Sequence, residues 1–101
     1  LDQEIFGPAG MTKTRIERPQ EVVPHLATGY RANGGKVQRA GFIDMRIPGA
    51  AGAAVSTAED LLRWDRALAK NVVISAESRR RMLTPEKGNY GYGTMLGEMG
   101  A

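Results

Sequence analysis

Residues 49–68 constrain the fold most strongly, because a run of very small residues leads directly into the start of a helix. The first six of them carry no side chain larger than a methyl group. A capping box follows, in which Ser56 can accept a hydrogen bond from the amide three residues on and Glu59 can reach back to the amide of Ser56. Apolar residues then recur at a helical spacing, at Ala58, Leu61, Leu62, Leu68 and Ala69. The pattern predicts a loop and then a helix over about residues 57–70.

Asp65 is the unusual residue of this predicted helix. The helical spacing places it inside the apolar stripe, among the leucines. A buried carboxylate without a partner is costly, so this side chain must have a partner, lie at an exposed edge or meet a polar surface. Two interpretations stay open, namely exposure at the edge of the stripe and an ion pair with an arginine of a neighbouring element.

The segment before the loop predicts an irregular region and a hairpin. Residues 1–24 open with the last turn or two of a helix and then hold three prolines without a sustained period. A helix whose start is missing, in a chain without an initial Met, leads us to expect that the natural chain begins earlier. Two short runs flank Asn33-Gly34-Gly35, and these residues tolerate the positive φ of tight turns, which predicts an antiparallel hairpin over residues 26–43.

The segment after the predicted helix is short. Ser75 is a plausible cap for a second helix over about residues 76–83, where positive charge in the later turns suits the helix dipole. Glycines at alternate positions predict a strand over about residues 90–96. The fold class expected is α+β, with two or three short helices, a small antiparallel hairpin and a C-terminal strand, forming a single domain over residues 1–101.

Composition excludes several classes of function. The net charge is +3, but Lys and Arg are scattered and no aromatic residue lies near the cluster at 79–81, so we expect no nucleic-acid partner. The absence of cysteine excludes disulfides and thiolate chemistry. The N-terminus lacks the pattern of a signal peptide, and no apolar run reaches the about 18 residues that span a bilayer.

The sequence offers no catalytic group, metal site or cofactor site. His25 is the single histidine, without a serine or an acid at an informative spacing. Ser56 and Thr57 stand at a helix start without an adjacent base, so capping explains both. Thr84 and Lys87 match a nucleophile-x-x-Lys spacing, but the intervening Pro85 opposes one helical turn. The glycine-rich segments match no phosphate-binding pattern.

Five segments in order nevertheless resemble the serine β-lactamase-related family, which includes class C β-lactamases, D-alanyl-D-alanine carboxypeptidases and esterases. The segments are IFGPAGMTKT, LATGYR, PGAAGAAVSTAEDLLRW, SAESRRRMLTP and YGYGTM. The resemblance implies a serine hydrolase that works through an acyl-enzyme, with a small-molecule or peptide substrate and a location in the cell envelope, the periplasm or outside the cell. It also implies a larger fold, composed of a helical domain and an α/β domain.

The nucleophile motif Ser-x-x-Lys, the Tyr-x-Asn motif and the Lys-Thr-Gly or His-x-Gly strand of that family are absent from this chain. We therefore expect an internal fragment of such an enzyme, inert alone. In the family the loop at Ala51, Gly52 and Ala53 lies near the rim of the active-site cleft, so the resemblance implies substrate binding there. Tight packing before a helix is the other interpretation.

A different class of function stays open beside this one. The chain could be a small non-enzymatic α+β module that binds a protein partner, or a second copy of itself, through its hairpin or the edge of the terminal strand.

Overall fold

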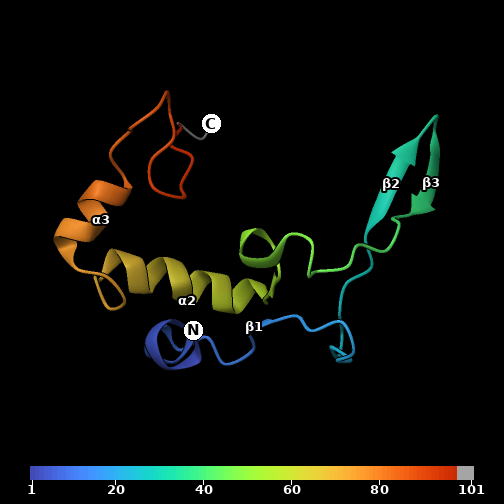
Figure 1. Cartoon of the computed structure of the whole chain (residues 1–101), viewed down its shortest axis with the longest axis horizontal. Helices are drawn as coiled ribbons and strands as arrows, with labels where there is room; N and C mark the ends of the chain where they lie inside the picture. Colours follow the sequence, from blue (N-terminus) through green and yellow to red (C-terminus); the bar gives the residue numbers. More distant parts are fainter. Residues whose placement is uncertain (98–101) are drawn as a thin grey trace. The chain divides into compact units, whose positions relative to one another are not determined.

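The computed structural model describes residues 1–97 (Figure 1). The chain, which was expected to form one domain, divides into two compact units, one composed of Leu1–Thr14 with Ser56–Ala101 and the other of Arg15–Val55. Helices make up the first unit and short antiparallel strand pairs the second, so the α+β class is confirmed.

The first unit contains a π-helical turn η1 (Asp2–Phe6), α1 (Gly7–Ala9), α2 (Ala58–Ala69) and α3 (Ala76–Met82). η1 and α1 contact each other, and α1 also contacts α2. None of the helices in the part of the chain that the structure describes is long and apolar enough to cross a membrane.

The cap of α2 is Thr57, one residue later than the sequence indicated. Its backbone is extended and its side chain accepts a hydrogen bond from the Asp60 amide at 3.2 Å. Ser56 is unavailable as a cap because its hydroxyl lies 2.8 Å from that of Thr14. Glu59 does not reach back either, since its carboxylate lies 3.7 Å from the Lys13 ammonium. The helix therefore starts at Ala58, close to the predicted start.

α3 begins where its local signal indicated. The Ser75 side chain accepts from the Ser78 amide at 3.0 Å. Glu77 in the first turn pairs with Arg80 and Arg81 one turn later. The hydrogen bonds from Arg80 and then from Arg81 lower the pKa of Glu77.

The core of the first unit lies on a different face of α2 from the predicted stripe. Ala9, Met11 and Ala67 are buried together, and Phe6, Trp64 and Val73 pack against them. Leu61 and Leu62 instead keep 57% and 50% of their surface exposed. The small side chain of Ala67 allows the N-terminal turns to approach α2 closely, whereas leucines at this position would hold them away.

Asp65 lies on the outward side of α2 with these leucines. Its side chain is exposed, and among residues 1–97 it forms no ion pair. Exposure, the first of the two interpretations, describes this residue.

The second unit contains two antiparallel pairs. β2 (Tyr30–Asn33) and β3 (Lys36–Arg39) form a hairpin, and all of their residues are exposed. Its turn is Gly34-Gly35, with φ of 55° and 76°, which only glycine adopts easily. β1 (Arg15–Ile16) pairs with β4 (Ala54–Val55), and the 3₁₀ turn η2 (Gly49–Ala51) precedes β4.

Residues 90–96 form a tight loop where a strand was expected. Tyr90 makes isolated bridges to Lys87 and Met95, and the Gly91 amide donates to the Thr94 carbonyl at 2.8 Å. A Cβ atom on Gly91 would lie 2.2 Å from the Met82 carbonyl oxygen, so glycine permits close contact with the end of α3. The alternate glycines therefore serve a turn and a close approach, which the period-two pattern does not distinguish from a strand.

Candidate functional site

The small loop is built as an ordered turn. The amide of Ala51 donates to the Pro48 carbonyl at 2.9 Å, and the amides of Gly52 and Ala53 donate to the Gly49 carbonyl at 3.2 and 2.9 Å. A Cβ atom on Gly52 would lie 3.2 Å from the Cβ atom of Pro48, which is tighter than ordinary contact. A side chain at Gly52 would therefore push against Pro48, so the turn favours glycine at this position.

The three predicted site residues differ in accessibility. Ala51 and Gly52 are exposed, whereas Ala53 is buried. The Ala53 carbonyl is also engaged, because it accepts a hydrogen bond from the Glu17 amide at 2.8 Å. Of these three residues, Ala51 and Gly52 present surface to a ligand, while Ala53 joins the turn to the neighbouring backbone at Glu17.

A cluster of polar groups centres on the buried carboxylate of Asp60, a residue for which the sequence predicted no role. Its side chain is 0% exposed. Oδ2 accepts from the Lys13 amide at 2.7 Å and from the Thr14 hydroxyl at 2.8 Å, and Oδ1 accepts from the Arg63 guanidinium at 2.6 Å. The helical spacing of Asp60 with Trp64 and Ala67 was the signal that could have identified it. Asp65 was considered instead, because that residue lies among the leucines.

The charge of Asp60 is set by competing effects. Burial raises its pKa, but hydrogen bonds from Thr14, the Lys13 amide and Arg63, with the Arg63 charge, together lower the pKa below its ordinary value. The carboxylate is therefore ionised at neutral pH and can only accept hydrogen bonds. Thr14 gives its single hydroxyl proton to Asp60, so Ser56 is the donor in the Thr14–Ser56 contact. The result is a directed chain from Ser56 through Thr14 to Asp60.

Each hydroxyl group considered as a nucleophile has a structural partner. Thr57 and Ser75 cap helices, and Ser56 contacts Thr14. Thr84 donates to the Arg80 carbonyl at 2.7 Å. His25 is exposed in a loop with φ of 59°. Residues 1–97 contain no group of three or more acidic, histidine or cysteine side chains that could hold a metal ion.

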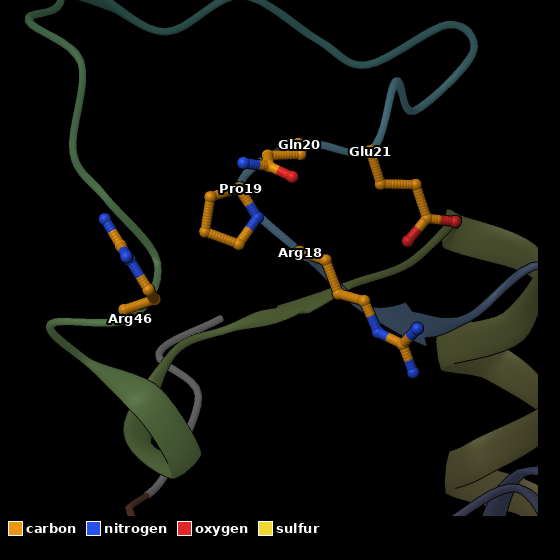
Figure 2. Close-up of a pocket in the computed structure, with 5 residues that line it drawn as sticks. All are labelled: Arg18, Pro19, Gln20, Glu21 and Arg46. Atoms are coloured by element: carbon orange, nitrogen blue, oxygen red, sulfur yellow. The ribbon is translucent and has the colours of Figure 1, made fainter.

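The second unit has an open pocket of about 470 Å³, lined by Arg18, Pro19, Gln20, Glu21 and Arg46. The side chains of Arg18 and Arg46 point in different directions in Figure 2. Arg46 is also paired with Asp44, whose carboxylate receives hydrogen bonds from the guanidinium at 2.9 and 3.0 Å. This hydrogen bonding raises the pKa of Arg46 and lowers that of Asp44. The pocket therefore lacks a convergent set of groups for a ligand.

Comparison with known proteins identifies the family of the chain. The beta-lactamase family model matches residues 1–99. The chain belongs to the beta-lactamase family. The resemblance of the five ordered segments is thereby confirmed.

Two relatives support the same assignment. PbpX of Bacillus subtilis (strain 168), which carries the name of a penicillin-binding protein, is 32% identical over 94 residues. This match covers 92% of the chain and 24% of PbpX. The crystal structure of a penicillin binding protein from Bacillus halodurans superposes with a TM-score of 0.73 at 26% identity, covering 91% of the chain and 30% of that protein. The chain thus spans about a quarter of the length of PbpX and 30% of the Bacillus halodurans protein.

Proposed function

We propose that the encoded protein of which this chain is a part is a serine hydrolase. It acts on β-lactam, peptide or ester bonds through an acyl-enzyme, and residues 1–101 are inert by themselves. The observation that carries the proposal is the match of the family model to residues 1–99 in a sequence without a Ser-x-x-Lys motif. Without that serine and lysine, neither an acyl-enzyme nor its activation is available.

The structural roles of the hydroxyl groups support inertness of the isolated chain. Ser56 donates to Thr14, Thr57 and Ser75 cap helices, and the described residues place no histidine or lysine side chain in hydrogen-bond contact with any of the three. A nucleophile needs such a base within reach.

We assign the loop at Ala51, Gly52 and Ala53 to the substrate side of the whole enzyme. The exposure of Ala51 and Gly52 and the hydrogen-bonded turn that holds them support this role. Their small side chains would let a flat ring or peptide approach the backbone. Ala53 contributes by position, because its side chain is buried.

The test compares two proteins with a chromogenic cephalosporin and a p-nitrophenyl ester. The encoded full-length protein should hydrolyse at least one of the substrates, and the chain of residues 1–101 should give only the background rate. Turnover by the short chain that Ser56→Ala abolishes would overturn its inertness. Failure of the full-length protein with both substrates and with a D-alanyl-D-alanine peptide would overturn the hydrolase proposal.

A further inference from the structure

Two hydroxyl side chains extend the register of the β1–β4 pair. Arg15 lies opposite Val55 in this antiparallel pair. Thr14 and Ser56 are the adjoining residues of the two strands, and their hydroxyl oxygens lie 2.8 Å apart. They therefore stand opposite each other as the next pair in the same register would.

The opposite end of the β1–β4 pair lies next to the loop at Ala51, Gly52 and Ala53. The Glu17 amide donates to the Ala53 carbonyl at 2.8 Å, which continues the alignment past Ile16 and Ala54. Ala53 is in turn bonded to Gly49 through its own amide at 2.9 Å. The alignment of the two strands thus decides where the loop ends.

So short a pair cannot hold its register alone. β1 and β4 have two residues each and are partly exposed, and register is weakly specified where neither face is buried. A shift of one residue would place Val55 or Thr57 opposite Thr14. The side chain of Val55 has no group that could form a hydrogen bond with Thr14, and the Thr57 side chain already caps α2.

Asp60 supplies the missing constraint. Its buried carboxylate accepts from both Lys13 and Thr14, so the backbone just before β1 is fixed to α2. Because Thr14 has given its proton to Asp60, its oxygen is free to accept from Ser56 just after β4. One carboxylate thereby orients the residues that flank both strands.

We propose that Asp60 is a positioning residue, which acts through Thr14 and Ser56 to hold the register of β1–β4 and hence the position of Ala53. Its consequence for substrate binding rests on the proposed function, but the register itself does not. A residue that only stabilised the helices would have no specific effect on the bond between Glu17 and Ala53.

The test measures amide hydrogen exchange in the encoded full-length protein. Thr14→Val removes the hydroxyl that joins Asp60 to Ser56 and keeps a similar shape. It should speed exchange of the Glu17 amide by roughly fivefold relative to the Arg79 amide of α3, the effect of one lost hydrogen bond. Ser56→Ala should also speed exchange of the Glu17 amide. Thr14→Ser keeps the hydroxyl, so it should leave the Glu17 amide protected.

Arg63→Gln is the matched control, because it removes a different partner of Asp60 and leaves Thr14 and Ser56 in place. It should leave the ratio of the two exchange rates unchanged. Equal loss of protection at Glu17 and Arg79 in the Thr14→Val protein would show that the cluster around Asp60 only stabilises the whole fold. That result would overturn the proposal. An unchanged Glu17 amide in both Thr14→Val and Ser56→Ala would overturn it as well.

Kinetics supply the second readout. In the full-length enzyme Thr14→Val should raise KM for the cephalosporin or ester several-fold with a smaller change in kcat, and Thr14→Ser should reverse this. If the full-length protein hydrolyses none of the substrates, the proposed function fails, while the exchange rates still decide the register. If it hydrolyses them and KM is unchanged despite faster exchange at Glu17, the link from register to substrate fails.

Discussion

Oδ2 of Asp60 lies 2.8 Å from the hydroxyl oxygen of Thr14, a residue 46 positions earlier in the chain. This contact joins the start of α2 to the segment that follows η1 and α1, and it is fully removed from solvent on the Asp60 side. A carboxylate at this position is stable only because each of its oxygens has a hydrogen-bond donor. The cluster explains why an acidic residue occupies the inward face of a helix.

Stability should depend on pH through Asp60. Its pKa is lowered in the folded protein, so its contribution to stability is present above the ordinary value of 3.8 and is lost as the pH falls through the folded value. Asp60→Asn removes this titration. The difference in melting temperature between the original chain and Asp60→Asn should be large near neutral pH and shrink below 3.8.

Two other carboxyl groups with a lowered pKa do not produce this difference. Asp44 and Glu77 are present in both proteins, so their effects on the two melting temperatures cancel. A difference in melting temperature that grows as the pH falls would contradict the assignment.

The capping assignment separates two neighbouring hydroxyl residues. Thr57→Ala should lower the free energy of unfolding by about 1 kcal/mol, because the Asp60 amide loses its acceptor at the start of α2. Thr57→Ser keeps the oxygen and serves as the control. Chemical denaturation followed by circular dichroism measures the change, and equal stability of the Ala and Ser variants would show that Thr57 is not the cap.

The close approach at Gly91 should be intolerant of any side chain. Gly91→Ala places a Cβ atom 2.2 Å from the Met82 carbonyl oxygen, so the loop must move off the end of α3. We expect a loss of about 1–3 kcal/mol in the free energy of unfolding. Gly97→Ala is the control, since nothing lies within 4 Å of its added methyl group. Similar stability of both variants in denaturant titrations would contradict the observed contact.

The candidate site was predictable only in part. Ala51, Gly52 and Ala53 were predicted through family resemblance, and the close approach of Gly52 to Pro48 agrees with the lack of a side chain at Gly52. The roles of Thr14 and Asp60 were not predicted, because neither stands in a motif that carries chemistry. Their hydrogen bond depends on two segments far apart in the sequence.

Sequence alone determined the features that depend on neighbouring residues. Ser75 begins α3, Gly34 and Gly35 form the hairpin turn, and a hydroxyl residue starts α2, because caps and tight turns are closed by bonds within a few residues. The order of the five segments likewise identified the family.

Tertiary structure alone decided which face of each segment is buried. α2 has an apolar side at Leu61 and Leu62, yet it turns Asp60 and Ala67 inward, because Met11 and Thr14 pack and bond there. Residues 90–96 became a loop because the end of α3 approaches the backbone at Gly91. Contacts with residues distant in the chain stabilise one buried face over another. A local sequence pattern therefore does not predict which face is buried.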